Sequence, residues 1–381
     1  MHRSSIYLLL ISVVGLVTLG VVMLFSTSAF AQDSHGDIYY FVKRQALWLL
    51  IGAGACVAGA MVDYHRWRAW WPWWYGLSAF LLALCFVPHV GMHINGASRW
   101  INLHVATFQP SEVAKLGALF FLCWWFSREG TDSPRVLHGL LIPVAVLSLL
   151  LALIAAEVDL GTTALIGAMA VGICFIAGAN TWLICGLGTL GITGILGIAS
   201  FIPERYARMT IFLHPEKERL GKGLQQWNAM IAFGSGGFEG LGLGNGRQKL
   251  LYLPEAHTDF IFPMIGEELG LLFTWLVVFG FIIITLSGGL IAANAKDRFG
   301  KLLAMGILLL ISLQAAVNIG MTTSLLPNKG MPLPFISYGG SNLAVSLFMV
   351  GILVNIHRIG IPVVPATDRQ VILAGRSVPR I

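Results

Sequence analysis

The sequence predicts an all-α, polytopic integral membrane protein, and three observations support this fold class. Hydrophobic residues make up 56% of the 381-residue chain and charged residues only 11%, whereas soluble domains are roughly 25% charged. Apolar runs long enough to cross a bilayer recur from one end of the sequence to the other. These runs are continuous, whereas the strands of a membrane β-barrel need period-two alternation.

We expect ten transmembrane helices, and the polar segments between them set their limits. They are predicted at residues 6–27, 45–62, 72–89, 112–127, 138–156, 161–178, 182–202, 260–286, 301–321 and 341–357. A cleavable signal peptide is the alternative for the first run, because Ser28, Ala29 and Ala31 resemble a cleavage site. The apolar run from Ile6 to Phe25 is about 20 residues long, which is a full span. We therefore expect an uncleaved first helix.

The distribution of Lys and Arg predicts that both termini are cytoplasmic. With the N-terminus inside, basic residues in the short cytoplasmic segments outnumber those in the short outer segments, as the positive-inside rule requires. We expect one transmembrane domain over residues 1–360 and a cytoplasmic tail over 361–381. A large extracytoplasmic loop, residues 203–259, then connects the seventh and eighth spans.

This topology places the chemistry outside the cell. The polar segments 90–111, 203–258 and 322–340 all meet the outer face, while the inner loops are short. Nucleotide-activated substrates are not expected there, so an outer-face enzyme that builds a bond needs a substrate that carries its own energy. A lipid-linked pyrophosphate is such a substrate. The sequence has no basic stripe with interleaved aromatic residues outside the apolar runs, which argues against a nucleic-acid partner.

Asp259 is the candidate catalytic residue. It lies where a polar loop enters an apolar span, and an ionisable group in such a place is a functional-site hypothesis. Because Pro263 is tolerated only in a first helical turn, we expect the helix to begin near Thr258 or Asp259. Asp259 is then either a general base or an N-cap. The two roles are compatible, because a helix N-terminus favours the charged carboxylate that a base needs.

Other acidic residues surround Asp259 in the sequence. Glu255, His257 and Asp259 alternate, so a divalent-metal site is a weaker alternative. Glu267 and Glu268 lie two turns deeper, and we expect one of them to bond to a neighbouring helix or to line a cavity.

The glycine-rich segment 234–246 lacks the preceding strand of a dinucleotide fingerprint, so that interpretation is rejected. Exposed backbone N–H groups leave two others open: a pyrophosphate cradle, or an irregular packed loop, which is favoured.

Three further segments surround the outer face. Arg99 offers a bidentate fork for phosphate, with headgroup anchoring as the alternative, and Lys115 offers a point charge one turn inside an apolar helix. We expect Ser111 to cap that helix and Asp159 to cap the sixth span. The Pro- and Gly-rich segment 327–341 predicts irregular backbone at membrane depth, which is tolerated only against protein or a watery cavity. It is interpreted as the wall of a cleft.

Taken together, these segments resemble the SEDS family (shape, elongation, division and sporulation) of peptidoglycan polymerases. The matching motifs are GASRWI at 96–101, QPSEVAK at 109–115, DLGTT at 159–163, LPEAHTDFIF at 253–262, IGEELG at 265–270 and PLPFISYGGS at 332–341. They follow one order over nearly the whole chain, and six linked motifs are far more specific than any one of them. NKGMPLP at 328–334 and LPEAH at 253–257 are more similar to the division branch than to the elongation branch.

The resemblance implies a ten-helix fold and an inverting glycosyltransferase in the cytoplasmic membrane of a bacterium. Its substrate would be lipid II, a disaccharide-pentapeptide on undecaprenyl pyrophosphate, and the family's catalytic aspartate falls on Asp259. Implied partners are a class B penicillin-binding protein and other membrane proteins of the division machinery. No cofactor is certain, but Mg²⁺ or Mn²⁺ stays open because some family members depend on divalent cations. The candidate substrate-binding residues are Arg44, Arg99, Lys115, Arg208 and Lys329.

Two other functions are carried as alternatives. A transporter that flips the lipid-linked precursor fits ten helices and Gly- and Pro-interrupted spans, but polar features gather on one side and no inverted repeat is visible. A non-catalytic scaffold for division proteins would not need Asp259.

Overall fold

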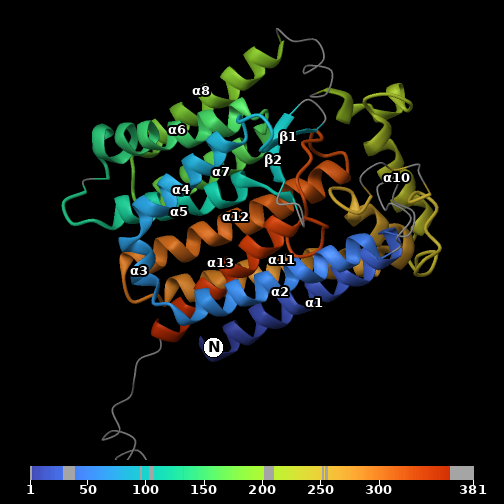
Figure 1. Cartoon of the computed structure of the whole chain (residues 1–381), viewed down its shortest axis with the longest axis horizontal. Coiled ribbons are helices and arrows are strands. Elements are labelled where there is room, and N and C mark those ends of the chain that lie inside the picture. Colours follow the sequence, from blue (N-terminus) through green and yellow to red (C-terminus); the bar gives the residue numbers. More distant parts are fainter. Residues whose placement is uncertain are drawn as a thin grey trace, which may run out of the picture.

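The helices of the protein lie side by side, and connecting segments lie at both ends of the bundle (Figure 1). The computed structural model describes residues 2–28, 39–94, 97–102, 107–131, 133–200, 210–250, 253 and 256–360. We call the end that carries the small sheet, α10 and the loop before the last helix the site end. The short helix α3 lies at the opposite end.

Each of the ten predicted spans coincides with a helix. The helices are α1 (His2–Ser28), α2 (Tyr40–Met61), α4 (Trp71–Leu84), α5 (Pro110–Ser127), α6 (Ile142–Ala156, extended at its start by a π-helical turn, Leu137–Leu141), α7 (Leu160–Ile176), α8 (Thr181–Ser200), α11 (Ile261–Ala293), α12 (Arg298–Thr322) and α13 (Gly340–Gly360). Within the described residues, 6 of these helices are long and apolar enough to cross a membrane: α1, α2, α6 with its π-helical turn, α11, α12 and α13. The chain is therefore a multi-pass membrane protein.

Shorter helices complete the helical part. α3 (Tyr64–Ala69) connects α2 to α4, and α10 (Leu224–Gly236) lies in the large loop. Two 3₁₀ turns, Ile211–Leu213 and Pro215–Glu218, precede α10. Residues 203–209 of that loop lie outside the described residues.

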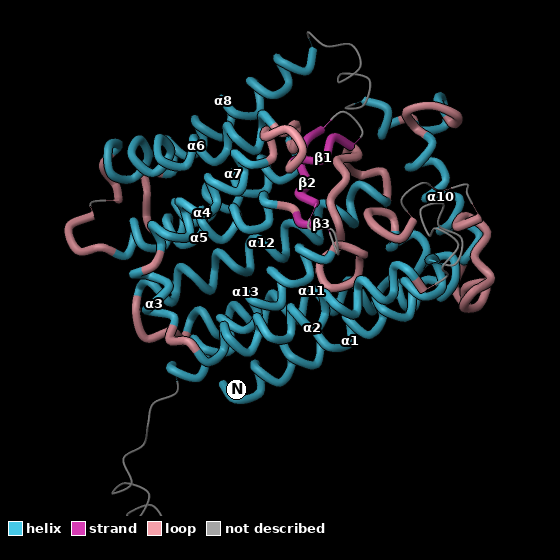
Figure 2. Tube along the Cα trace, in the orientation of Figure 1, coloured by secondary structure: helices cyan, strands magenta, loops and turns pink. Residues whose placement is uncertain are grey.

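The all-α expectation was incomplete, because a small sheet connects α4 to α5 (Figure 2). β1 (Gly91–Ile94), β2 (Ala97–Asn102) and β3 (Thr107–Phe108) form an antiparallel sheet in the order β1-β2-β3. Ile101 pairs with Phe108, which places β3 beside the second half of β2. Strands this short give little period-two signal, and the apolar spans on both sides mask it.

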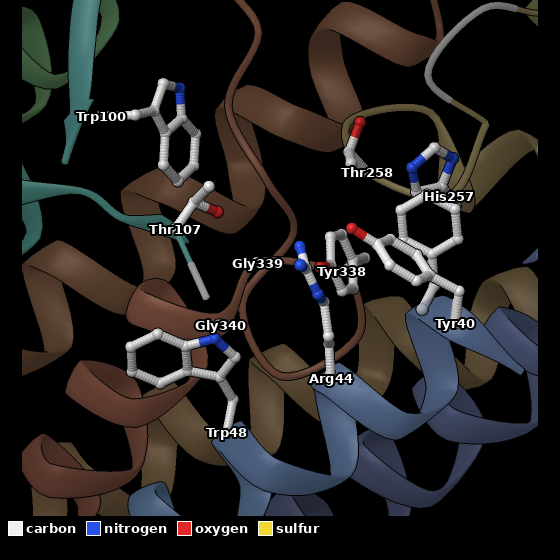
Figure 3. A pocket seen from close by; sticks show the side chains of 11 residues that line it. Tyr40, Arg44, Trp48, Trp100, Thr107, His257, Thr258, Tyr338, Gly339 and Gly340 are labelled. Atoms are coloured by element: carbon white, nitrogen blue, oxygen red, sulfur yellow. The ribbon is translucent and has the colours of Figure 1, made fainter. Parts of the chain in front are cut away.

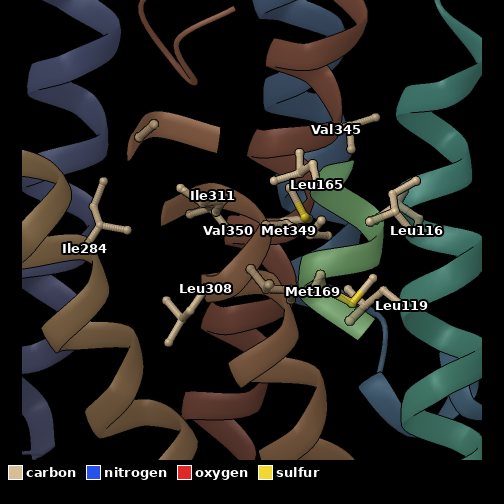
Figure 4. Close-up of a cluster of buried hydrophobic side chains, with 14 of the residues drawn as sticks. Leu116, Leu119, Leu165, Met169, Ile284, Leu308, Ile311, Val345, Met349 and Val350 are labelled. Carbon is tan, nitrogen blue, oxygen red and sulfur yellow. The ribbon is translucent and has the colours of Figure 1, made fainter. Parts of the chain in front are cut away.

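The hydrophobic core is centred on α12. Figure 4 shows side chains from α5, α7, α11 and α13 meeting those of α12, among them Leu116, Leu165 and Leu308. All three are at most 4% exposed. Because lipid is as apolar as these side chains, close packing rather than water exclusion holds such helices together. Gly351 of α13 illustrates this, since a Cβ there would collide with the main chain of α2 at Cys56.

A break in α11 connects this helix to the glycine-rich loop. Gly270 has φ 75° and ψ −172° inside the helix, a conformation that glycine adopts without a Cβ penalty. The break releases the carbonyls of Glu267 and Glu268, and these accept hydrogen bonds from the loop amides of Leu241 (2.9 Å) and Gly242 (2.9 Å). In return, the amide of Leu271 donates to the carbonyl of Gly237 in the loop (3.1 Å). The loop therefore replaces one turn of helical hydrogen bonding.

The side chains of Glu267 and Glu268 secure the same loop from within. Glu267 accepts hydrogen bonds from the amides of Arg247 (2.9 Å) and Gln248 (3.2 Å), and Glu268 accepts one from the amide of Gly244 (2.9 Å). Within segment 234–246, the amide of Gly244 thus binds a carboxylate of α11, and those of Leu241 and Gly242 bind its carbonyls. These contacts favour the interpretation of a packed loop over a pyrophosphate cradle.

Glu268 also forms a buried ion pair. Its carboxylate lies 2.6 Å from Lys249 Nζ and accepts a hydrogen bond from Ser26 of α1 at 2.7 Å. Both charged side chains are at most 1% exposed. The expectation that one of the two glutamates bonds to a neighbouring helix is confirmed.

Removing one partner of this pair should destabilise the fold. Lys249→Met leaves the Glu268 carboxylate buried without its cation, which costs about 3–5 kcal/mol. We expect a clear fall in the apparent melting temperature of the purified protein in detergent. Lys217→Met removes an exposed lysine of the large loop 203–259, which also contains Lys249. This variant should melt like the wild type. Equal melting of the two variants would contradict this account.

Candidate active site

Asp259 lies at the site end, in the turn that precedes α11. The helix begins at Ile261, and Phe260 occupies the N-cap position without a side-chain cap. The expected start at Thr258 or Asp259, and with it the N-cap role of Asp259, was therefore wrong. Pro263 still falls in the first turn. The carboxylate of Asp259 is half-buried and faces the loop before α13, since a Cβ built on Gly330 would lie 3.1 Å from Asp259 Oδ2.

Two buried amides of α12 hold the backbone around Asp259. Asn318 Nδ2 donates to the carbonyls of Asp259 (2.9 Å) and Met331 (2.6 Å). One turn earlier, Gln314 Nε2 donates to the carbonyl of Pro332 (2.8 Å). Neither residue was predicted from the sequence, although polar side chains four residues apart in an apolar span are a recognisable signal.

The loop before α13 is irregular and largely buried, as expected. Its polar backbone groups are paired with protein groups: the amide of Tyr338 donates to the carbonyl of His257 (3.0 Å), and Gln45 Nε2 donates to the carbonyl of Ser337 (3.3 Å). The amide of Leu333 donates to Ser337 Oγ (2.8 Å). This pairing lets non-helical backbone persist at such depth.

A pocket of ≈ 290 Å³ opens beside Asp259 (Figure 3). α2, the sheet, the turn before α11 and the start of α13 contribute to it. The lining residues are Tyr40, Phe41, Arg44, Trp48, Trp100, Thr107, His257, Thr258, Tyr338, Gly339 and Gly340. Thr258, the residue directly before Asp259, is among them, so the pocket reaches the turn that carries Asp259. The interpretation of segment 327–341 as the wall of a cleft is confirmed.

The pocket combines aromatic walls with a guanidinium group and has no carboxylate among its lining residues. Arg44 projects into it in Figure 3, with its guanidinium carbon 4.3 Å from the centre of the Tyr40 ring. Burial raises the pKa of Tyr338, and the nearby Arg44 opposes that rise. A planar cation among aromatic rings is suited to a phosphate ester, because it offers several N–H donors.

Trp48 forms part of the floor of this pocket. It lies against Gly340 so closely that a Cβ on Gly340 would overlap the indole ring. A Cβ on the neighbouring Gly339 would make only ordinary contacts of 3.6–3.8 Å. The missing side chain at 340 therefore lets Trp48 pack beneath the start of α13.

Lys115 does not line the pocket. Its ammonium is buried, 2.9 Å from both carboxylate oxygens of Glu112 and 2.8 Å from Gln314 Oε1. Asn342 Nδ2 of α13 donates to the same carboxylate (3.1 Å). Through Gln314, which also holds Pro332, the ion pair links α5, α12, α13 and the loop before α13.

Arg99 is also engaged by the protein. From β2 it donates to the carbonyl of Val158 at 2.5 Å, in the turn between α6 and α7 where Val158 has a positive φ of 66°. The adjacent Glu157 is 1% exposed. Burial raises the pKa of Glu157 to about 8; the Cys85 thiol and Arg99 act against this rise, and Asp159 adds to it.

Asp159 caps α7 as expected, accepting a hydrogen bond from the amide of Thr162 (3.1 Å). The expectation for Ser111 was wrong. Gln109 is the N-cap of α5, and Ser111 lies inside the helix and donates to Asp159 Oδ2 (3.2 Å). Pro110 starts the helix two residues earlier than a Ser111 cap would allow.

The remaining expected residues are only partly placed. Lys329 is half-buried and directly precedes Gly330, which lies against Asp259. Arg208 and Glu255 lie outside the described residues. Within the described ranges, no three His, Cys, Asp or Glu side chains are grouped so as to hold a metal ion. The described residues therefore do not make a metal site by themselves, and we derive no chemical step through one.

A family comparison agrees with this arrangement. The family model FtsW/RodA/SpoVE, described as "Cell cycle protein", matches residues 7–360. The chain belongs to the FtsW/RodA/SpoVE family. A protein of Trichlorobacter lovleyi, named "Probable peptidoglycan glycosyltransferase FtsW", is 39% identical over 364 residues, which is 95% of each chain. The stage V sporulation protein E of Bacillus subtilis is 38% identical over 356 residues, covering 92% of this chain and 96% of its own.

Solved structures of similar fold extend the FtsW/RodA/SpoVE assignment. RodA, the rod shape determining protein of Thermus thermophilus, superposes with a TM-score of 0.68 at 25% identity, over 93% of this chain and 97% of its own. A second chain, from a structure described as "Structural coordination of polymerization and crosslinking by a peptidoglycan synthase complex", has a TM-score of 0.77 at 25% identity, over 93% of this chain and 98% of that one.

The buried Glu157 makes a prediction about pH. Its folded pKa of about 8 lies above the ordinary value of about 4.3, so the folded state binds more protons between these values. Stability from this group is present below about pH 4.3 and is lost as pH rises towards 8 and beyond. Glu157→Gln, which stays neutral, should melt higher than the wild type at pH 9 by about 2 °C or more, and this difference should become much smaller at pH 5.

The measurement is the apparent melting temperature across pH 5 to 9 in detergent. Glu129→Gln, which removes an exposed carboxylate, is the control and should follow the wild-type curve. A pH-independent difference between Glu157→Gln and the wild type would contradict the prediction.

Proposed function

We propose that this protein is a peptidoglycan glycosyltransferase that polymerises lipid II into glycan strands, with Asp259 as its general base. The observation that carries the proposal is the half-buried Asp259, which directly follows Thr258 in the wall of a pocket lined by aromatic rings and Arg44, at one end of an apolar bundle. Relatives over nearly the whole chain are named as glycosyltransferases of this kind. The proposed base thus lies one residue from the wall of a pocket that also holds a cation.

In the proposed reaction, the acceptor's 4-hydroxyl oxygen attacks the anomeric carbon of the donor sugar. Asp259 takes the hydroxyl proton as the new glycosidic bond forms, which is worth roughly 10²–10⁴-fold in rate. The bond between the anomeric carbon and the phosphate oxygen breaks on the opposite face, so the configuration inverts. The leaving lipid pyrophosphate keeps the bonding electron pair, and its growing charge requires cations or N–H groups aimed at it.

We assign the substrate cations on the basis of position. Arg44 lines the pocket and Lys329 adjoins the contact between Gly330 and Asp259, so these two are proposed to bind the pyrophosphate. Arg99 and Lys115 hold protein groups, and we propose that they shape the walls of the site instead. Arg208 stays a proposal from sequence alone.

We propose the following setting for this activity. Ten helices cross the cytoplasmic membrane of a bacterium, both termini are cytoplasmic, and the site end faces outward. The loop 203–259 then lies outside the cell, and residues 361–381 form a cytoplasmic tail. This orientation follows the distribution of Lys and Arg in the short loops.

We further propose that the protein acts in cell division with a transpeptidase partner. Several relatives bear the name FtsW, and one similar structure is described as a synthase complex that combines polymerization with crosslinking. A class B penicillin-binding protein is the partner that such a complex would need, together with other membrane proteins of the division machinery.

Replacing the proposed base should abolish strand synthesis. Asp259→Asn keeps the side-chain shape but cannot accept the proton, so polymerisation of purified lipid II should fall by at least about 100-fold. The variant should still fold and bind its partner. Wild-type amounts of polymer from this variant would exclude the base role.

The same variant separates the alternatives. A flippase that does not polymerise should make no polymer even as the wild type, and its loss of function would appear in a vesicle flipping assay. Retained flipping by Asp259→Asn alongside lost polymerisation favours the enzyme, and a fully functional variant that binds its partner favours a scaffold.

Closing the pocket should also reduce polymerisation. In Gly340→Ala the new Cβ overlaps Trp48, so the indole must move from beneath α13 towards the pocket. We expect a loss of activity of about 10-fold or more, since small displacements near reacting groups are costly. Gly339→Ala is the matched control, because its Cβ has room, and it should keep most of the activity. Equal activities would contradict the role of the pocket.

A further inference from the structure

Asn318 occupies an unusual place in the bundle. It is fully buried in α12, the central helix, and its amide nitrogen reaches two main-chain carbonyls at once, those of Asp259 (2.9 Å) and Met331 (2.6 Å). Only the NH₂ group can donate to two carbonyls, so the orientation of the amide is fixed by its partners. Asn318 Oδ1 is turned away and, among the described residues, has no hydrogen-bond partner.

The two carbonyls belong to the two segments that meet at the Asp259 carboxylate. Asp259 lies in the turn before α11, and Met331 directly follows Gly330. A Cβ built on Gly330 would lie 3.1 Å from Asp259 Oδ2. The side chain of Asn318 therefore fixes the spacing between the acid and the loop that faces it. Gln314 continues the same connection one turn away, at Pro332.

A purely structural role is the alternative, and the chain contains an example of it. Asn355 of α13 is equally buried and also bridges backbone groups: its amide nitrogen donates to the carbonyl of Ala60 (2.8 Å), and its oxygen accepts from the amide of Tyr64 (2.9 Å). These contacts hold the turn between α2 and α3 at the opposite end of the bundle. Asn355 is thus a matched control for burial and for the loss of a bridging amide.

We propose that Asn318 is a positioning residue for the reaction, because it sets the main chain of Asp259 against the loop that carries Gly330 and Met331. The proposal rests on the proposed function of Asp259 as base. A proton acceptor works only within hydrogen-bond reach of the hydroxyl group, and a displacement of about 1 Å at a reacting group can cost about 100-fold in rate. Loss of the bridge should therefore appear in kcat more than in substrate affinity.

The test compares Asn318→Leu with Asn355→Leu, each a change to an apolar side chain with the same number of heavy atoms. Initial rates of polymerisation of purified lipid II by the full-length protein give kcat and KM, and an unfolding scan gives the apparent melting temperature. We expect both variants to melt lower than the wild type. Only Asn318→Leu should lower kcat per folded molecule, by about 30-fold or more, with KM within about 3-fold of the wild type.

Asn318→Ser covers the case in which the leucine variant does not fold. Its hydroxyl retains one donor on a shorter side chain, so kcat should lie between the wild type and the Asp259→Asn variant. A wild-type kcat in Asn318→Leu, or in Asn318→Ser where the leucine variant does not fold, would overturn the proposal. Equal losses of kcat in Asn318→Leu and Asn355→Leu would also overturn it, since the effect would then be one of general stability.

The two proposals fail in different ways. An active Asp259→Asn variant removes the base role, whatever Asn318 does. An inactive Asp259→Asn variant together with a fully active Asn318→Leu variant removes only the positioning role.

Discussion

The site depends on a constraint that membranes impose on backbone: every polar main-chain group at membrane depth must find a partner inside the protein. Helices meet this requirement by themselves, but the turn before α11 and the loop before α13 do not. The amides of Gln314 and Asn318 supply the donors that these segments lack. Since both amides come from the central helix, these two irregular segments are attached to the core of the bundle.

The cations of the polar segments fall into two groups with different roles. Lys115, Lys249 and Arg99 are engaged by the protein, two of them in buried ion pairs and one on a backbone carbonyl. Arg44 instead lines the pocket. Buried ion pairs add little net stability, but breaking one is costly, so such pairs fix the relative positions of the elements that they connect.

The sequence predicted the parts of this structure that follow from continuous hydrophobicity and from local capping. All ten apolar runs coincide with helices, Asp159 caps α7, and the loop before α13 lines a cleft. The sheet was missed because β3 has only 2 residues. The start of α11 was placed too early because a proline in the first turn is compatible with several starting positions.

The roles of the candidate side chains were harder to predict than the helices, for a physical reason. Whether Lys115 faces a substrate or a carboxylate depends on Glu112 one turn earlier and on Gln314, which is far away in the sequence. Trp48 and Tyr338 come together in the pocket only when α2 packs against the start of α13. Such contacts are tertiary, and they cannot be inferred from a single sequence.

The break at Gly270 has a consequence for the transfer of Asp259 and the start of α11 into another scaffold. Loop amides replace the missing helical hydrogen bonds, and the side chains of Glu267 and Glu268 accept hydrogen bonds from further loop amides. The first turns of α11 therefore depend on this loop for part of their hydrogen bonding. Copying the helix alone would carry over unpaired carbonyls and two orphaned glutamates. The smallest segment that keeps the start of α11 paired therefore runs from α10 through Leu271 and brings Ser26 of α1 with it, because this serine bonds Glu268. Holding Asp259 in place would also require Asn318 and the loop around Gly330 and Met331.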